Sequence, residues 1–123
     1  MIKEIAFSIY AVTDMARSRK FYEGVLGLIP NGEFDKEADT KWVEYNIGTS
    51  TLAIGCSPDW KPSQDGAVVA LEVDNFEMAV EKLKAQNVTF MMEPQDFPTC
   101  HMAVIEDPDR NRITIHQKKI TAK

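Results

Sequence analysis

The sequence predicts an α+β fold in which two βαβββ modules form a curved mixed sheet of about eight strands, with one helix packed outside each module. One observation is a repeat. IAFSIYAVTD runs into MARSRKFYEGVLGL, and about sixty residues later AVVALEVDN runs into FEMAVEKLKAQNV. The other is that Asp14 and Asp74 occupy equivalent turns between a strand and a helix. A repeated half of this kind predicts a cup with a ligand site on its inner face.

The first module opens with a strand over residues 4–12, where side chains alternate between two largely apolar faces. The faces are Ser8, Tyr10 and Val12 on one side and Phe7, Ile9 and Ala11 on the other. Asp14 is a good N-cap for a helix that runs to Leu26 and stops at Gly27. Helical spacing gives that helix an apolar side, which predicts that it lies on the sheet.

A hairpin follows, with strands over 42–47 and 51–56. If Thr49 and Ser50 form a two-residue turn, Asn46 faces the same side as Ala53. The alternation then puts three residues on the inner face, namely Trp42, Glu44 and Asn46, and three on the helix-covered face, namely Val43, Tyr45 and Ile47. The charged stretch Asp35, Lys36, Glu37 and Asp39 is typical of a solvated loop or sheet edge.

The second module repeats the order. A strand over 67–73 precedes a helix over 76–86, and a short strand over 89–92 ends where Pro94 and Pro98 break the chain. The last hairpin pairs 99–106 with 112–117. Its turn, Asp107 to Asn111, has residues suited to backbone geometry and is structural, not catalytic.

Size and charge restrict the function. A chain of 123 residues is expected to be one domain, made of module 1–57, linker 58–66 and module 67–123. A net charge of −5 argues against nucleic acid as a partner. The sequence has no apolar run long enough to cross a membrane and no signal peptide, so we expect a cytoplasmic protein. In a reducing cytosol Cys56 and Cys100 are predicted to stay thiols.

These segments resemble the glyoxalase, bleomycin-resistance and extradiol-dioxygenase superfamily, also called the vicinal oxygen chelate superfamily. The matching pieces are Asp14 with FYEGVLGL, then ALEVDNFEMAV, then DPDRN followed by RITIHQ, and they span almost the whole chain. The resemblance implies a small-molecule ligand and a homodimer. It also implies metal ligands, usually His, Gln or Glu, on the inner face of the first and last strands of each module.

Carried over one by one, those ligand positions fall on Phe7, Ala53, Val68 and Thr114. Phenylalanine, alanine and valine offer no donor atom to a divalent metal, and threonine is a poor one. We therefore expect no metal and no other cofactor. This departure from the superfamily pattern argues against glyoxalase, dioxygenase and metal-dependent thiol-transferase activity together.

The two histidines offer a second possible metal site. If Glu106 closes the last hairpin opposite Arg112, then His116 lies opposite Met102 and His101 points to the other face. In that register the histidines do not share an ion, whereas a slip of one residue would change this. The same register puts Cys100 and His116 on the inner face as diagonal neighbours. Two interpretations are open: the histidine activates the thiol, or a small buried cysteine lies beside a hydrogen-bonded histidine.

Carboxylates on the inner face are the remaining reactive groups. Glu72 or Glu44 could act as a base in a partly apolar cup, or could be a solvated charge at its rim. The side chain of Trp60, in the linker, has three possible roles: a lid over the cup, a contact with a partner or a cover for the junction between the modules. The candidate catalytic residues are Glu72, His116 and Cys100. The predicted ligand-binding residues are Phe7, Ile9, Trp42, Glu44, Asn46, Glu72, Met102, Thr114 and His116.

Apolar walls with few polar groups are typical of a small-molecule pocket. The preferred interpretation is a metal-independent protein of the bleomycin-resistance or glyoxalase-like type that holds an organic ligand in an aromatic-lined cup. The alternative is a lyase, isomerase or dioxygenase-type enzyme of the same superfamily, with a displaced metal site or with Glu72 or His116 as base. A structural or regulatory dimer is a third class.

Overall fold

The computed structural model describes residue 1 and residues 4–37 and 39–119, except for the side chains of Lys36 and Glu37. The chain divides into two compact units, residues 1–63 and residues 64–123. The division falls inside the segment 58–66 that the sequence predicts as a linker. Each unit has a strand, a helix and three more strands, so the predicted α+β class and the βαβββ order are confirmed.

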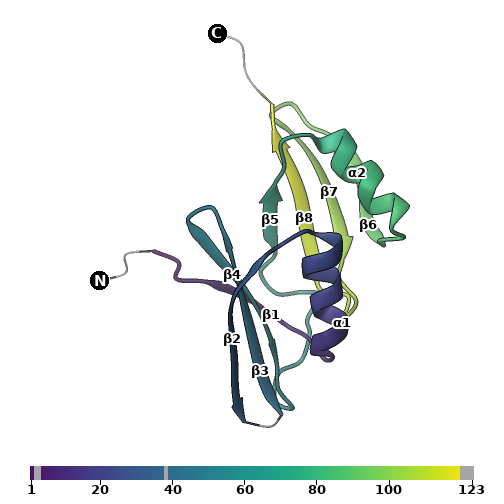
Figure 1. Ribbon diagram of the computed structural model, residues 1–123. Coiled ribbons are helices and arrows are strands. Elements are labelled where there is room, and N and C mark those ends of the chain that lie inside the picture. The colour runs from purple at the N-terminus through teal and green to yellow at the C-terminus, as the bar shows by residue number, and fades with distance from the viewer. Residues whose placement is uncertain (2–3, 38, 120–123) are drawn as a thin grey trace. The chain divides into compact units, whose positions relative to one another are not determined.

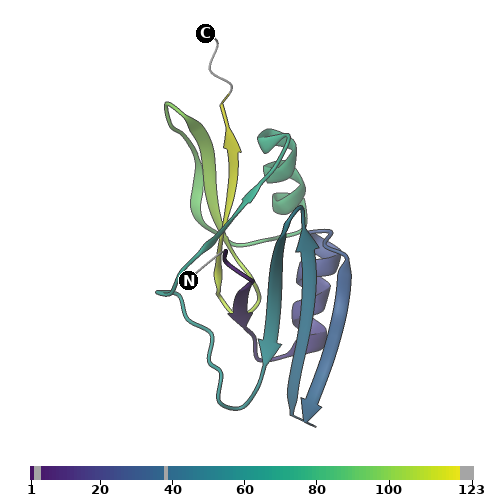
Figure 2. The same ribbon diagram turned by 90° about the vertical axis from the view of Figure 1, so that its left-hand side faces the viewer.

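Unit 1 is a four-stranded sheet with one helical segment against it (Figures 1 and 2). Its strand order is β1-β4-β3-β2, with β1 parallel to β4 and the other pairs antiparallel. The elements are β1 (Ser8–Ala11), α1 (Met15–Arg19), the π-helical η1 (Lys20–Val25), β2 (Pro30–Glu37), β3 (Thr40–Ile47) and β4 (Ser50–Cys56). The first strand is shorter than the predicted 4–12, and β2 at the sheet edge contains most of the predicted charged stretch.

The helix of unit 1 begins where the sequence predicts. The side chain of Asp14 accepts a hydrogen bond of 3.0 Å from the backbone N–H of Arg17, as an N-cap does. After Arg19 the helix widens, and the N–H of Leu26 donates to the carbonyl of Phe21. Gly27 then adopts a φ of 73°, a conformation that glycine enters without strain, and the helix ends.

The core of unit 1 lies between this helix and the sheet. The rings of Tyr22 and Tyr45, both fully buried, stack with centroids 6.2 Å apart. The Tyr45 hydroxyl donates to Glu23 over 2.9 Å, and Arg19 pairs with the same carboxylate at 2.6 Å. Burial and the bond to Glu23 both raise the pKa of the Tyr45 hydroxyl. These contacts join the end of the helix to β3.

The turn between β3 and β4 differs from the prediction by one residue. Ile47 pairs with Ser50, so the turn residues are Gly48 and Thr49, not Thr49 and Ser50. Gly48 has a φ of 60°, which explains the shift, because the tight turn needs a residue that tolerates positive φ. The partner of each β3 residue therefore shifts by two positions, from Ala53 to Thr51 for Asn46, so the pairing keeps its parity. Trp42 and Asn46 therefore share the face opposite the buried Tyr45, as predicted.

Unit 2 is a second four-stranded sheet, with order β5-β8-β7-β6 and β5 parallel to β8 (Figure 1). Its elements are β5 (Val69–Glu72), α2 (Phe76–Ala85), β6 (Phe90–Asp96), β7 (Cys100–Glu106) and β8 (Arg112–Lys118). The N-cap of α2 is Asn75, whose side chain accepts from the N–H of Met78 at 3.1 Å. The helix starts at Phe76, as predicted, but its cap is Asn75 and not the acidic Asp74, which lies one residue earlier in the same turn.

Strand β6 continues past the point where the sequence predicts a break. Pro94 lies within the strand, which runs to Asp96. The strand tolerates it because β6 is at the edge of the sheet and its pairing with β7 is irregular between Met92 and Gln95. A proline there removes no hydrogen bond that an inner neighbour needs.

The last hairpin confirms its predicted register. Glu106 pairs with Arg112, and Met102 pairs with His116. One face of the hairpin is buried below α2, and its residues are Ala103, Ile105, Ile113 and Ile115. His101 is on that face and His116 is on the other, so the predicted separation of the two histidines is confirmed.

The hairpin turn is held by one buried carboxylate. Asp107 accepts hydrogen bonds from the N–H of Asp109 at 2.9 Å, from the N–H of Asn111 at 2.8 Å and from the Asn111 amide at 2.9 Å. Asp107 and Asn111 are both buried. The side chains of Asp107 and Asn111 therefore hold the backbone of this turn in place.

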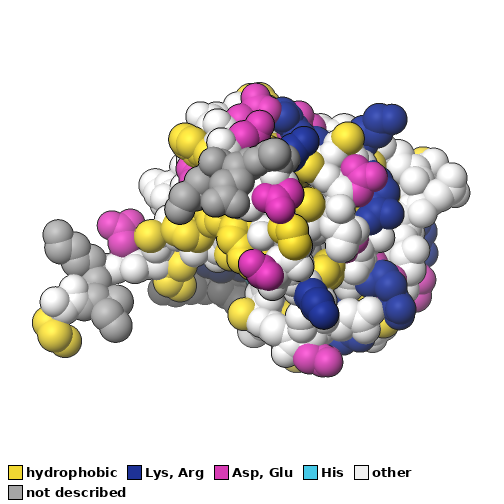
Figure 3. All heavy atoms as spheres, turned by 90° about the horizontal axis from the view of Figure 1, so that it is seen from below, with side chains coloured by type: hydrophobic (Ala, Val, Ile, Leu, Met, Phe, Trp, Pro, Cys, Tyr) yellow, Lys and Arg dark blue, Asp and Glu magenta, His cyan; other side chains and the backbone are white. Residues whose placement is uncertain are grey.

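In the part of the chain described here, no helix has the length and hydropathy needed to span a bilayer. Acidic and basic side chains are interspersed on the face that Figure 3 shows. With a net charge of −5, such a surface is a poor match for a phosphate backbone.

Candidate functional site

Aromatic rings gather on the face of the unit 1 sheet that points away from the helix. Phe7 and Trp42 meet edge to face with centroids 5.4 Å apart, and Trp42 and Trp60 do the same at 6.0 Å. Phe34 lies opposite Trp42 in the β2–β3 register and is more than half exposed. We call these four residues, Phe7, Phe34, Trp42 and Trp60, the aromatic face. Phe34 and Trp60 were not among the predicted ligand-binding residues.

A glycine lets Trp60 reach this face. A Cβ atom on Gly55 would lie 2.7 Å from the Trp60 ring and 3.0 Å from the end of the Ile9 side chain, so any larger residue would displace them. Gly55 also pairs with Trp42 across β3 and β4. The indole of Trp60 therefore rests on the backbone of β4 beside Trp42. Trp60 thus covers part of the sheet of its own unit.

The polar residues predicted on this face already have partners. The indole N–H of Trp42 donates to Glu44 over 2.9 Å, which fixes the orientation of the Trp42 ring. Asn46 accepts from the Thr51 hydroxyl at 3.1 Å. Glu44 thus accepts a hydrogen bond from Trp42, and its second carboxylate oxygen retains the capacity to accept another.

In unit 2 the corresponding face carries a histidine and a carboxylate that contact each other. Nδ1 of His116 lies 2.6 Å from Oε1 of Glu72, its direct neighbour in the β5–β8 register. The other oxygen of Glu72 accepts from the N–H of Lys118 at 2.8 Å. This backbone bond and the His116 contact lower the pKa of Glu72, so the group is a carboxylate at neutral pH. The sequence predicted both residues on this face but not their contact.

The other predicted residues of unit 2 lie on the same face by register. Met102 pairs with His116, and Val104 pairs with Thr114. Cys100 pairs with Lys118, so it is diagonal to His116, and it is buried. Among the described contacts no hydrogen bond joins the Cys100 thiol to the imidazole, which favours the interpretation of a buried cysteine.

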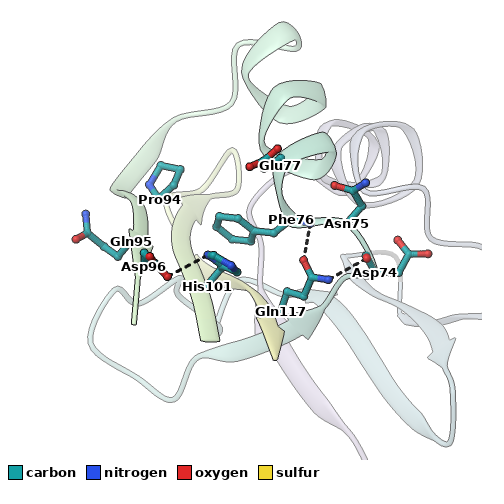
Figure 4. Close-up of a pocket in the computed structure, with 9 residues that line it drawn as sticks. All are labelled: Asp74, Asn75, Phe76, Glu77, Pro94, Gln95, Asp96, His101 and Gln117. Atoms are coloured by element: carbon teal, nitrogen blue, oxygen red, sulfur yellow. Dashed lines mark hydrogen bonds and ion pairs between the residues drawn. The ribbon is translucent and has the colours of Figure 1, made fainter. Parts of the chain in front are cut away.

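A cavity of about 500 Å³ lies at the start of α2, on the opposite side of the unit 2 sheet (Figure 4). His101 stacks on Phe76 with centroids 5.4 Å apart and lies 3.6 Å from Asp96. Gln117 accepts from the N–H of Phe76 at 2.8 Å and donates to the carbonyl of Asp74 at 2.9 Å. His101 thus belongs to the packing around the start of α2. Sequence reasoning missed this cavity, because its residues come from four separate segments.

A second cavity, of about 370 Å³, belongs to unit 1 and lies between the end of β4 and the segment after it. Cys56 is half-buried at its wall and Trp60 contributes to it. Strand β4 ends at Cys56, and the chain leaves the sheet at Ser57. Cys56 and Cys100 are both free thiols in the structure.

The positions that match the metal ligands of the resembled superfamily do not suit a metal. Phe7 packs against Trp42, Ala53 is fully buried, and Val68 is half exposed. Thr114 supplies a single hydroxyl. Within residues 4–37 and 39–119 no group of three or more His, Cys, Asp or Glu side chains is arranged to hold an ion. The residues present do not fit the usual metal of this fold.

Sequence comparison gives the family. A sequence model described as the glyoxalase/bleomycin resistance protein/dioxygenase superfamily matches residues 2–115. The chain belongs to this superfamily. Among curated proteins, a lactoylglutathione lyase from Neisseria meningitidis is 29% identical over 122 residues, covering 88% of this chain and 86% of the lyase.

Solved structures of the superfamily have the same fold. TnmS3, an antibiotic-binding protein from Streptomyces, aligns with a TM-score of 0.81 at 18% identity and covers 96% of this chain and 98% of its own. The trypanothione-dependent glyoxalase I of Leishmania major aligns with a TM-score of 0.78 at 20% identity, over 94% and 87% of the two chains. The fold is thus shared by a binding protein and an enzyme.

Proposed function

We propose that this protein is a metal-independent small-molecule-binding protein that holds a planar organic ligand against its aromatic face. The observation that carries the proposal is the cluster of Phe7, Trp42 and Trp60 on a sheet face away from the helix. Rings with exposed faces and edges offer stacking surface at a low cost in conformational entropy. Antibiotic binding by TnmS3 on the same fold supports the proposal.

The geometry of Trp42 suits a binding wall. Its indole is held by Glu44, by Phe7 and by Trp60, so little rotamer freedom remains to be lost on binding. Trp60 comes from the segment after β4 and lies over a glycine, so it is the ring that a ligand would displace or stack upon. Ile9 and Phe34 extend the apolar wall, and Glu44 and Asn46 supply its sparse polar groups.

The prediction that the same ligand contacts Glu72, Met102, Thr114 and His116 remains a proposal. Each of these residues lies on the face of its own sheet that points away from α2. Whether Trp42 and His116 line one cup is decided by binding measurements on variants of both.

Tryptophan fluorescence is expected to report ligand binding directly. The chain has two tryptophans, and both belong to the aromatic face. A panel of aromatic antibiotics should contain a compound that quenches this fluorescence at saturation and raises the melting temperature. Trp42→Ala should weaken binding of that compound about tenfold or more, because it removes a stacking partner worth about 1.5 kcal/mol.

Phe97→Ala is the matched control, since Phe97 is a similarly exposed aromatic residue of unit 2. It should leave the dissociation constant unchanged. Equal losses in the two variants, or a panel that changes neither fluorescence nor melting temperature, would refute the proposal.

Metal independence has its own test. Because the four ligand-equivalent positions lack suitable donors, addition of zinc, nickel or manganese should leave the melting temperature unchanged. Purified protein should contain metal far below one ion per chain by elemental analysis. Near-stoichiometric metal retained after dialysis would contradict this, and would favour the alternative of a lyase or dioxygenase with a displaced metal site.

We also propose, by its membership of the superfamily, that the protein is a homodimer, and from its composition that it is cytoplasmic. Light scattering that gives the mass of one 13.9 kDa chain would contradict the first. Cell fractionation that places the protein outside the cytoplasm would contradict the second.

A further inference from the structure

The proton on His116 has a defined position. Glu72 is ionised, so its oxygens only accept hydrogen bonds, and the 2.6 Å contact therefore requires that Nδ1 carries the hydrogen. In the neutral imidazole Nε2 is then unprotonated and is the basic atom. Within residues 4–37 and 39–119, Nε2 has no hydrogen-bonding partner.

Glu72 is itself fixed. One oxygen accepts from His116 and the other from the backbone N–H of Lys118, two positions along β8. A carboxylate held at both oxygens keeps the imidazole in one tautomer and one orientation. The carboxylate also stabilises the positive charge that the imidazole gains when Nε2 takes up a proton.

We propose that His116 is the general base of a metal-free proton-transfer site and that Glu72 is its positioning residue. This goes beyond ligand binding, and because both residues belong to unit 2 it does not depend on the aromatic face of unit 1. The substrate class is a small, largely apolar C–H acid, such as a β,γ-unsaturated carbonyl compound with hydrogen on the carbon next to its carbonyl group.

The chemistry balances without a further reagent. Nε2 removes the proton from the substrate carbon, and the electron pair of that C–H bond is delocalised onto the adjacent carbonyl oxygen. In a substrate with a β,γ-double bond the resulting dienolate also carries negative charge at its γ-carbon, so the imidazolium returns the proton there and the double bond moves into conjugation with the carbonyl group. The net change is an isomerisation, with nothing oxidised or reduced.

The surroundings of His116 suit such a substrate. Met102 lies directly opposite His116 on β7, and Thr114 precedes it by two positions on the same face of β8. Both are half-buried, and they offer apolar surface and one hydroxyl. The charged or titratable residues of unit 2 on this face, by register, are Glu72, Cys100, Glu106, Arg112 and Lys118.

The test uses 5-nitrobenzisoxazole as the probe substrate. A general base removes its single ring C–H proton, the electron pair forms a nitrile, and the N–O bond breaks to release a coloured phenolate. A positioned base contributes about 10²- to 10⁴-fold. The wild-type protein should therefore release phenolate at least about 10²-fold faster than His116→Ala.

His101→Ala is the matched control, because His101 is the other histidine of the chain and lies on the opposite face. It should keep the wild-type rate. If His116→Ala retains the wild-type rate, or if His101→Ala loses as much, the proposal is overturned.

Glu72→Gln tests the positioning role by two measurements. The phenolate release rate should fall about tenfold or more, since an uncharged glutamine does not stabilise the imidazolium and its NH2 group must face one of the two donors, Nδ1 of His116 or the N–H of Lys118. In nitrogen-15 spectra of the neutral imidazole, wild-type His116 should show a protonated Nδ1 and an unprotonated Nε2, and this difference should shrink in the variant. Because Glu72 is exposed, the melting temperature should change little. An Nε2-protonated tautomer in the wild type, or an unchanged rate in Glu72→Gln, would refute the assignment.

Discussion

Replacing Tyr22 by alanine is expected to lower the free energy of unfolding by about 3 to 5 kcal/mol, the cost of removing a large aromatic ring from a packed core. Tyr22 is fully buried and its ring contacts three others, those of Tyr10, Phe21 and Tyr45. The ring lies between the helix and the sheet of unit 1, so its loss leaves a cavity that neither element closes without moving. Urea unfolding followed by circular dichroism measures the change.

Phe34→Ala is the control for this prediction. It removes an aromatic ring from the same unit, but the ring is more than half exposed. Its expected cost is below about 1 kcal/mol. A cost for Tyr22→Ala as small as that for Phe34→Ala would show that the helix and sheet of unit 1 do not depend on this ring.

Asp107→Ala should lower the free energy of unfolding by about 2 to 4 kcal/mol, through a different mechanism. The substitution deletes a buried acceptor and leaves the backbone N–H and the side-chain amide of the buried Asn111 without their partner. A buried donor without an acceptor costs more than an ordinary hydrogen bond contributes, because the group has lost water as well.

Asp107→Asn separates the hydrogen bonds of this turn. Its carbonyl oxygen still accepts from the two backbone N–H groups, whereas its amide nitrogen meets the Asn111 amide, donor against donor. About half of the loss is therefore expected, measured by the same urea unfolding. Asp59→Ala, at an exposed position, should have almost no effect. If Asp107→Ala is no more costly than Asp59→Ala, the turn does not depend on this carboxylate.

Periodicity and turn chemistry were enough to predict which residues face which way. The alternation of Val43 and Tyr45 with Trp42 holds because one side of the sheet must be buried beneath a helix. The register of the last hairpin followed from its turn residues, and it separated His101 from His116 correctly. Where such local rules competed, one exact position was wrong, because the β3–β4 turn uses Gly48 and Thr49, not Thr49 and Ser50.

The contacts between segments were decided only by the tertiary structure. The pairing of Glu72 with His116 depends on β5 lying parallel to β8, which brings together residues 44 positions apart. Trp60 reaches Trp42 because Gly55 leaves room for the ring, and the spacing of residues along the chain does not encode that close approach. A sequence pattern predicts which side chains are buried, because burial depends on the polarity of each residue and on its position along the strand or helix. Which side chains meet depends on how distant segments pack, and that geometry placed the carboxylate on the imidazole.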